Sequence, residues 1–339
     1  MLNTVYQLKR PRQFEVAFKE MEIDDRQVIV RPTRLSICHA DQRYYQGARA
    51  EEILRQKLPM ALIHEGIGKV IYDPTGTFEI GTEVVMIPNR PVEKDDIIAE
   101  NYLRSSKFCA SSMDGFLQEY VQAVPDRFVR LPQGINPTVA AYTELVSVSF
   151  HAINRFLRFS HERRDVIGVW GDGNLGYITS LLLKKMLPDS KIYIFGVTEN
   201  KLSDFTFADG TYCVNEIPAD MQIDHAFECV GGGAASKAIN QIIDYIHPEG
   251  TISILGVSED PAPINTRMVL EKGLRIFGSS RSGRSDYEGL LHLYEEHPEI
   301  ISYLEMGAEV EVRDVKDITR AFEMDIHKLM GKTVMIWNE

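Results

Sequence analysis

The sequence predicts an α/β protein in which a β-rich part is followed by a doubly wound parallel sheet. Three observations lead to this fold class. Short apolar or alternating runs, broken by Gly and Pro, fill the chain up to about residue 150. From about Asp165 onward, strand-like and helix-like segments alternate. A glycine-rich turn, residues 171–176, joins the first strand of this alternating part to its first helix.

Length and composition are those of an ordinary globular protein with room for a sizeable core. The chain has 339 residues, 44% hydrophobic and 25% charged, which fits one large or two ordinary domains. No apolar run approaches the roughly 18 residues that cross a bilayer, and the polar N-terminus lacks the apolar core of a signal peptide. We therefore expect a cytoplasmic protein without a membrane segment.

Charge and cysteine usage exclude two further classes of protein. The net charge is −12 and there is no block of basic residues, so nucleic acid is not expected as the main partner. The four cysteines, Cys38, Cys109, Cys213 and Cys229, form neither CxxC pairs nor a disulfide framework. In a reducing compartment they should be thiols or metal ligands.

The first part of the chain reads as a series of strands. Strand-like runs are expected at residues 28–37, 66–71, 82–88, 116–121 and 128–132. Residues 90–110 are polar and are expected to form a surface excursion with some helix. Residues 137–157 carry apolar side chains at helical spacing and predict a helix.

The second part has the βαβ rhythm of a parallel sheet covered by helices on both faces. Strands are expected at 166–170, 191–195, 226–230, 251–256 and 275–278, and helices at 175–187, 198–205 and 234–246. The tail is expected to hold helices at 286–295 and 318–324 and a last strand at 332–337. We expect one domain from residues 1–150 and 285–339, and a second from residues 151–284.

The turn Gly171-Asp172-Gly173-Asn174-Leu175-Gly176 has glycine at its first, third and sixth positions. This pattern lets the backbone pass close to a pyrophosphate, and the helix that follows points free N–H groups at the phosphates. A glycine-rich turn without a ligand is the alternative. The strand before the turn and the helix after it favour dinucleotide binding.

Two short motifs in the β-rich part could hold a metal ion. Cys38 follows the run at 28–37, and His64-Glu65 follows about one strand later. A thiolate, an imidazole and a carboxylate suit a borderline-soft cation such as zinc. Taken singly, Cys38 could be an inert buried thiol and His64 a structural histidine. Their occurrence together, ahead of a dinucleotide fold, favours a metal site.

Two further acids could belong to that site. Glu144 lies on an otherwise apolar helical face and is either a metal ligand or a solvated helix residue. Asp41 lies three residues after Cys38. It could accept the N–H of His64 and fix the tautomer of that ring, or it could cap a helix.

These residues resemble those of the zinc-containing medium-chain dehydrogenase/reductase family over essentially the whole chain. The positions of Cys38, His64-Glu65 and Glu144 resemble the polyol-dehydrogenase branch, in which a glutamate replaces the third cysteine near the metal. A narrower resemblance, to ribulose-5-phosphate reductases (ribitol-5-phosphate dehydrogenases), rests on the runs 42–45, 99–103, 170–176 and 278–283. The resemblance implies a GroES-like β-rich catalytic domain and a Rossmann domain that binds NADP(H).

The family roles are transferred residue by residue. The resemblance implies one catalytic zinc held by Cys38 and His64, with Glu65 able to approach it. It implies Glu144 as the last ligand, direct or through water, and Asp41 as a residue that contacts the ligands rather than the metal. Tyr44 matches an aromatic residue beside the substrate, and Arg281 an arginine near the substrate cleft between the domains. The expected cofactor residues are Gly171, Gly173, Asn174, Leu175, Gly176, Thr198, Lys201 and Gly256.

The sequence departs from the family pattern at three places. Residues 89–115 contain only Cys109, so no structural zinc is expected. Ala40 stands where relatives have a Ser or Thr that relays a proton, so water held by Glu65 or Glu144 is the expected route. Gly196 stands where an acid would hold the ribose 2′-OH of NAD(H). The lack of an acid at position 196, with Thr198 and Lys201 nearby, favours NADP(H) over NAD(H). Lys201 could instead be an ordinary surface lysine.

The reaction implied by the resemblance is the NADPH-dependent, zinc-assisted reduction of D-ribulose 5-phosphate to D-ribitol 5-phosphate, for CDP-ribitol synthesis in teichoic acid or capsule assembly. A phosphorylated ketose needs cations, and the candidates are Arg43, Arg49, Lys57, Arg281 and Arg284, with Arg43 and Arg281 favoured. The alternatives are a zinc polyol or alcohol dehydrogenase acting with NADP on an unphosphorylated substrate, and a nucleotide-binding sensor without turnover. The resemblance also implies a homodimer and an association with a cytidylyltransferase.

Overall fold

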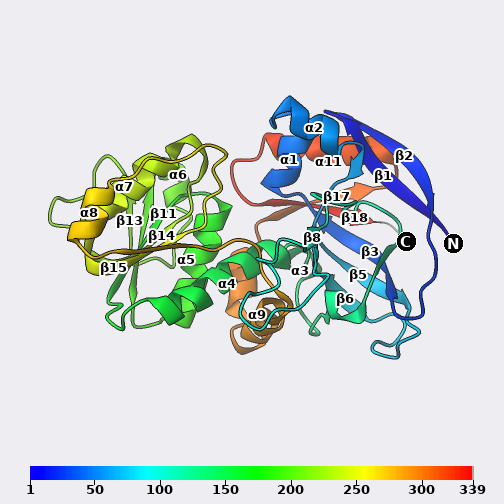
Figure 1. Ribbon diagram of the computed structural model, residues 1–339, viewed down its shortest axis with the longest axis horizontal. Helices are drawn as coiled ribbons and strands as arrows, with labels where there is room; N and C mark the ends of the chain where they lie inside the picture. Colours follow the sequence, from blue (N-terminus) through cyan, green and yellow to red (C-terminus); the bar gives the residue numbers. More distant parts are fainter. Residues whose placement is uncertain (338–339) are drawn as a thin grey trace. The chain divides into compact units, whose positions relative to one another are not determined.

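The computed structural model describes residues 1–337 (Figure 1), which fold into two compact units. The first unit contains Met1–Leu145 and the chain from Ser282 onward, and the second is Val146–Arg281. These limits lie a few residues from the expected divisions at 150/151 and 284/285. Within residues 1–337 no helix combines the length and apolar character that a membrane span requires.

The first unit is built mainly from β-sheet. A hairpin of β1 (Leu2–Arg10) and β2 (Gln13–Glu20) adds the short β4 (Met60–Ala61) to form a three-stranded sheet. The larger sheet has seven strands. Six of them follow the order β10 (Phe128–Arg130), β6 (Glu83–Met86), β5 (Glu65–Tyr72), β3 (Val28–Ser36), β18 (Lys332–Trp337) and β17 (Gly307–Val312), and the seventh, β9 (Val121–Ala123), pairs with β3.

The C-terminal strand β18 lies beside β3 in this sheet, antiparallel to it (red beside blue in Figure 1). Val334 pairs with Ser36, and the N–H of Ile37 donates to the carbonyl of Thr333 over 2.9 Å. The tail of the chain therefore returns to the first unit, next to the segment that leads into Cys38.

Seven helices of the first unit are described, some of them short. They are α1 (His39–Tyr45), α2 (Glu51–Lys57), α3 (Pro137–Ala140), the start of α4 (Thr143–Phe159), α9 (Arg284–Glu296), α10 (Glu299–Leu304) and α11 (Val315–Ile326). The buried side chain of Gln42 joins α1 to α11, since its amide donates to the carbonyl of Phe322 and to Asp325, both over 2.9 Å. Phe14, Tyr45 and Phe322 pack together beneath these helices.

The excursion at residues 90–110 differs from its prediction. Within the described chain it holds only the two short paired strands β7 (Asn89–Arg90) and β8 (Lys107–Phe108) and turns, and no helix. Glu100 anchors it, because its carboxylate accepts two hydrogen bonds from the buried guanidinium of Arg127 (2.9 and 3.2 Å) and one from the N–H of Arg284 (2.9 Å). An ion pair thus ties the excursion to the body of the unit.

The second unit is a six-stranded parallel sheet. Its order is β13 (Gly210–Cys213), β12 (Lys191–Gly196), β11 (Val166–Trp170), β14 (Ile223–Glu228), β15 (Ile246–Ile254) and β16 (Arg275–Gly278). This is the 3-2-1-4-5-6 order of dinucleotide-binding folds. The connections contain α5 (Asn174–Met186), α6 (Glu199–Leu202), α7 (Ala235–Tyr245) and α8 (Thr266–Glu271).

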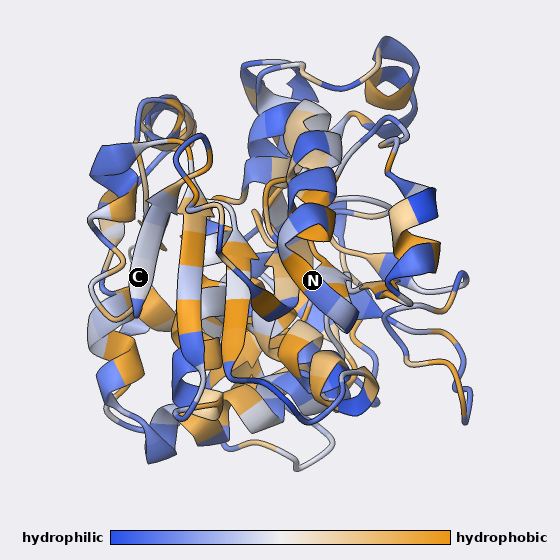
Figure 2. Cartoon of the chain, turned by 90° about the vertical axis from the view of Figure 1, so that its left-hand side faces the viewer, coloured by the Kyte–Doolittle hydropathy of each residue, from blue (hydrophilic) through white to orange (hydrophobic). Residues whose placement is uncertain are grey.

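Hydrophobic side chains fill the space between this sheet and its helices. The core includes Trp170, Phe195, Ile223, Ile242 and Ile252. Trp170 stacks on Phe195 of the neighbouring strand, with ring centroids 3.9 Å apart. Figure 2 shows strands with long hydrophobic stretches beside helices of mixed hydropathy, as expected for elements that bury one face.

Two other predictions needed correction. The expected strand at 116–121 is absent, and only β9 (Val121–Ala123) forms there. Residues 115–117 instead donate backbone hydrogen bonds to the carbonyls of Ala61, Leu62 and Ile63, the residues that precede His64. The helix expected at 137–157 is divided into α3 and α4 at Ala141–Tyr142.

Candidate metal and cofactor sites

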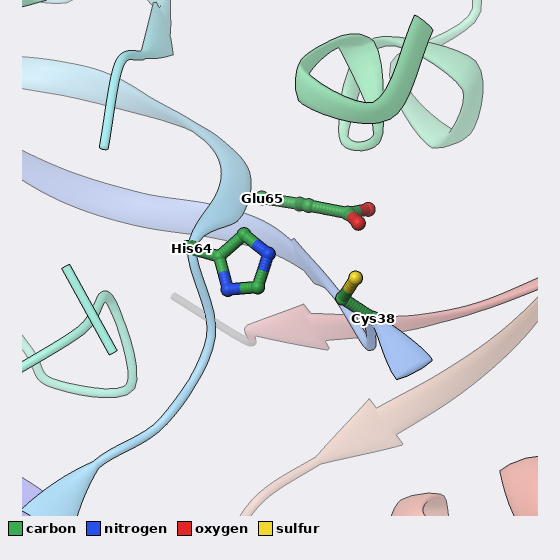
Figure 3. A group of neighbouring side chains, drawn as sticks. All are labelled: Cys38, His64 and Glu65. Atoms are coloured by element: carbon green, nitrogen blue, oxygen red, sulfur yellow. The ribbon is translucent and has the colours of Figure 1, made fainter. Parts of the chain in front are cut away.

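Cys38, His64 and Glu65 come together in the first unit (Figure 3). Cys38 lies just beyond the end of β3 at Ser36, and His64 directly precedes β5. These two strands pair so that Ser36 lies opposite Glu65. One ligand atom from each side chain lies within 4.8 Å of the others, and this is the one such group among residues 1–337. Sulfur, nitrogen and oxygen donors in this arrangement fit zinc, so the three residues form a possible zinc site.

Asp41 orients the backbone around this group. It is buried on α1, its Oδ2 accepts the N–H of Cys38 (3.1 Å) and its Oδ1 accepts the N–H of Ile63 (3.0 Å). One carboxylate thus holds the chain at Cys38 and at the residue before His64. Asp41 therefore caps the start of α1, which was one of the two roles considered for it from the sequence.

Asp41 also faces the ring of His64. Its Oδ1 lies 3.6 Å from Nδ1 of that ring, longer than a hydrogen bond but within electrostatic reach. The other ring nitrogen points toward Cys38 and Glu65 (Figure 3). Burial opposes the charged imidazole, but Asp41 and Cys38 together outweigh it and raise the pKa of His64 well above its usual value.

Lys332 is a member of the site that the sequence reading missed. Its Nζ lies 2.9 and 2.8 Å from the two carboxylate oxygens of Glu65, and both side chains are almost completely buried. Burial disfavours the ammonium, but Glu65 and Cys38 raise the pKa of Lys332 above its usual value. A lysine at the start of an apolar strand was the available signal, because a buried lysine requires an acidic partner.

Glu144 lies near this group but is outside the set of three ligand atoms. It is in the first turn of α4 and only 6% exposed. Burial raises its pKa to about 7; His64 partly opposes this, and Glu65 adds to it. The structure thus places a buried carboxyl within electrostatic reach of His64 and Glu65, and its role as a ligand stays a prediction.

The predicted substrate residues have different surroundings. Arg43 is half-buried on α1, and Tyr44 is buried in the core with the guanidinium of Arg49 4.3 Å from its ring centroid. Arg281 has a left-handed backbone with φ of 59°, which is uncommon for a non-glycine residue. Arg284 donates to the carbonyls of Asp126 and Phe128 and pairs with Glu288, so it has a structural role.

The glycine turn has the close packing expected of a dinucleotide-binding loop. A Cβ on Gly176 would lie 1.9 Å from the carbonyl oxygen of Gly171, and one on Gly171 would lie 2.9 Å from that of Cys229. Gly171 also has φ of +128°. Gly173 faces open space instead, which leaves room for a ligand to approach the backbone. Asn174 and Leu175 begin α5, and the N-terminus of a helix at this place in the fold favours phosphate oxygens.

A cavity of about 260 Å³ opens beside this turn. It is lined by the turn, the end of β12, Val214 and one side of α7, including Lys237 and Gln241. The turn glycines, the helix start and the cavity fit the adenosine and phosphate groups of a dinucleotide. Lys237 was not anticipated from the sequence.

Of the predicted cofactor residues, Gly171 and Gly173 line this cavity in the described chain. The others do not, namely Asn174, Leu175, Gly176, Thr198, Lys201 and Gly256. Gly256 is required for packing, since a Cβ there would lie 2.3 Å from the N of Gly231. The buried carboxylate of Glu228 holds the two loops together by accepting the N–H groups of Val230, Gly231 and Gly256.

The absence of an acid from position 196 has a steric reason. Gly196 does not leave empty room, because a Cβ there would lie 2.7 Å from the Cβ of Asp172 and 2.8 Å from Leu202. The side chain of Asp172 already fills that space. The end of β12 therefore has no acid of its own, and the carboxylate beside it is that of Asp172 from the neighbouring glycine turn.

Comparison with known proteins agrees with these features. Residues 24–133 match the family model described as alcohol dehydrogenase GroES-like domain, and residues 202–296 match that described as zinc-binding dehydrogenase. The predicted fold class, a GroES-like domain with a Rossmann domain, is confirmed.

Relatives of the chain are similar over their full length. The chain is 56% identical to a ribulose-5-phosphate reductase of Bacillus spizizenii and 55% identical to ribulose-5-phosphate reductase 1 of Staphylococcus aureus, in each case over 99% of both chains. The crystal structure of S. aureus TarJ in complex with NADPH superposes with a TM-score of 0.89, at 49% identity and complete coverage of both chains. The chain therefore belongs to the zinc-binding alcohol dehydrogenase family and, within it, to the ribulose-5-phosphate reductases.

Proposed function

We propose that this protein reduces D-ribulose 5-phosphate to D-ribitol 5-phosphate with NADPH. The observation that carries the proposal is the convergence of Cys38, His64 and Glu65, which a chain that only binds nucleotide would not need. The full-length similarity to ribulose-5-phosphate reductases supports the substrate, and the NADPH-bound relative supports the cofactor. The reaction adds a hydride to the C2 carbonyl carbon and a proton to its oxygen, while NADPH becomes NADP⁺.

Cys38, His64 and Glu65 would hold the zinc, with Glu144 as the proposed last ligand, direct or through water. When bound there, zinc supplies a Lewis acid that polarises the ketone and stabilises the developing alkoxide. Asp41 fixes the backbone that carries Cys38 and His64, and its position opposite Nδ1 leaves Nε2 of His64 for the metal. Lys332 balances the charge of Glu65.

The proton that completes the reduction needs a source other than residue 40. Ala40 has no hydroxyl group to relay it. Glu144 is a buried carboxyl close to the metal ligands, and Glu65 lies among them. We infer that water held by one of these two carboxylates delivers the proton to the alkoxide oxygen.

Arg43, Tyr44 and Arg281 are the proposed substrate residues. A guanidinium suits a phosphate group because its paired N–H groups can donate to two oxygens at once. Arg43 is four residues from His39 on the same side of α1 and follows Cys38 closely in sequence. Tyr44 stays a predicted substrate residue, although its side chain is buried in the core of the first unit beside Arg49.

In the second unit the residues 171–176 and the first turn of α5 would bind the cofactor's pyrophosphate through backbone N–H groups. When bound there, NADPH supplies the hydride. Thr198 and Lys201 are the proposed contacts of the 2′-phosphate, and Gly256 stays a predicted cofactor residue.

The cellular setting is also a proposal. The family resemblance supports a cytoplasmic homodimer whose product is used by a cytidylyltransferase to make CDP-ribitol for cell-wall polymers. Light scattering of the purified protein tests the dimer, and co-purification with a cytidylyltransferase tests the association. A monomer at micromolar concentration would contradict the first of these inferences.

The reaction is tested by following NADPH oxidation with ribulose 5-phosphate, xylulose 5-phosphate and free ribulose, before and after removal of zinc by a chelator. We expect turnover with ribulose 5-phosphate, little with free ribulose, and loss of turnover without zinc. Equal rates with free ribulose would favour a polyol dehydrogenase acting on unphosphorylated substrates. Full activity in protein free of zinc would overturn the metal-assisted mechanism.

A further inference from the structure

The carboxylate of Asp172 joins two neighbouring turns of the second unit. Asp172 is the second residue of the glycine turn after β11, and its Oδ2 accepts the backbone N–H groups of Val197 (2.9 Å) and Thr198 (2.8 Å) after β12. The residue is only 9% exposed and lines the cavity beside the glycine turn. A buried carboxylate with two such donors is held firmly in place.

The same side chain determines which residue can end β12. A Cβ at position 196 would meet the Cβ of Asp172 at 2.7 Å, the Oδ2 of Asp172 at 2.9 Å and Leu202 at 2.8 Å. Such contacts with a fixed side chain and a packed core residue cannot be relieved cheaply. Asp172 and a larger residue at position 196 therefore exclude one another.

This arrangement bears on how the ribose end of the cofactor is recognised. In many dinucleotide folds an acid at the end of the second strand accepts the ribose 2′-OH and repels a 2′-phosphate. Here the acid comes from the adjacent turn, and two N–H donors offset its negative charge. The acid is thereby turned toward the protein backbone, which reduces its repulsion of a phosphate.

The hydrogen bonds from Val197 and Thr198 to Asp172 also determine which groups are left to bind a 2′-phosphate. The N–H groups of Val197 and Thr198 are committed to Asp172, so side chains must provide the contacts. Lys237 lines the same cavity as Val197, and Lys201 follows in α6. The position of the turn relative to these cations depends on the carboxylate that holds it.

We propose that Asp172 is a positioning residue that sets the preference for the 2′-phosphorylated nicotinamide cofactor by locking the turn after β12. The inference rests on the proposed function for the identity of the cofactor. It concerns the second unit alone, so it can be tested by binding, without the sugar substrate and without the metal site.

The test measures the dissociation constants of NADPH and NADH for the full-length zinc-loaded protein, by calorimetry or nicotinamide fluorescence. We expect Asp172→Ala to weaken NADPH binding about tenfold and NADH binding much less, so that the ratio of the two constants falls. Asp172→Asn keeps one oxygen that can accept from both N–H groups, without the charge, and should give a smaller change in the ratio. A fall in both affinities by the same factor would show a merely structural role and overturn the proposal.

Asp209→Asn is the matched control. Asp209 also accepts a backbone N–H from β12, that of Ile192 over 2.8 Å, but at the other end of the strand. It should leave the ratio unchanged, and an equal shift in this variant would contradict a specific role for Asp172. If Asp172→Ala fails to fold, the ratio of the NADPH and NADH dissociation constants of Asp172→Asn tests the proposal instead. A preference of the unmodified protein for NADH would instead overturn the proposed cofactor, which separates that failure from failure of the Asp172 inference.

Discussion

Lys332 and Glu65 form an ion pair inside the first unit, with Nζ 2.8 and 2.9 Å from the two carboxylate oxygens. The two residues are 267 positions apart in the chain and are 3% and 0% exposed. The pair joins the C-terminal strand β18 to the strand that carries a predicted zinc ligand. Charge balance at the metal site thus depends on the return of the tail to this unit.

Removing Lys332 should destabilise the protein strongly. Lys332→Met leaves the carboxylate of Glu65 buried without its partner, and breaking a buried pair in this way costs about 3–5 kcal/mol of the free energy of unfolding. Chemical denaturation of the zinc-free protein measures the change. In Lys332→Met/Glu65→Gln both charges are gone, so this double variant should recover much of the loss. A double variant no more stable than Lys332→Met would contradict the pairing.

The predicted ligands should differ in their effect on zinc content. Cys38→Ser and His64→Ala each remove a donor that the structure places in the group of three, so each should purify with less than one zinc per chain and lose most activity. Glu144 is outside that group, and Glu144→Gln should retain zinc while reducing turnover. Elemental analysis and steady-state kinetics on the same samples measure both. Loss of zinc from Glu144→Gln would instead make Glu144 a direct ligand.

The sequence predicted best those features that depend on local pattern. The strands 166–170 and 275–278 coincide with β11 and β16, and the glycine turn lies between a strand and a helix as expected. Cys38, His64 and Glu65 could be associated because each sits at the end of a recognisable strand. Their convergence then follows from the pairing of β3 with β5.

Features that depend on distant contacts were not predictable in the same way. Nothing near Lys332 in the sequence indicates Glu65 as its partner, because sheet pairing of β18 with β3 brings them together. Asp172 had no predicted role in the glycine turn, although its carboxylate determines what can stand at Gly196. The apolar run at 116–121 looked like a strand from its sequence. It does not form one, because its pairing with residues 61–63 is too short.

Lys237 should contribute to the affinity for NADPH. It lines the cavity beside the glycine turn, whereas Lys201 is not among the lining residues of the described chain. Lys237→Met should therefore weaken NADPH binding several-fold, with a smaller effect on NADH, because only NADPH carries the 2′-phosphate. The effect should shrink as salt is added, since an exposed ion pair is screened. A larger loss from Lys201→Met than from Lys237→Met would assign the phosphate contact to Lys201.

His225 should make the stability of the second unit depend on pH. The residue is fully buried, its Nδ1 accepts the N–H of Thr251 (3.1 Å), and its ring lies 4.2 Å from that of His161 between centroids. Burial, aided by the charge of His161, lowers its pKa to about 4 from the 6.5 of an unfolded histidine. Below pH 6.5 the unfolded chain takes up the proton more readily, so the free energy of unfolding falls until about pH 4.

The size of this effect follows from the two pKa values. Between pH 7 and pH 5 the contribution of His225 should lower the free energy of unfolding by about 2 kcal/mol. His225→Gln keeps an oxygen that can accept from Thr251 but does not titrate, so its unfolding free energy should vary less over the same range. Asp224, paired with Arg163, is present in both proteins, so its contribution cancels in the comparison. Chemical denaturation at the two pH values measures the difference, and parallel pH dependences in the two proteins would mean that folding leaves the pKa of His225 unchanged.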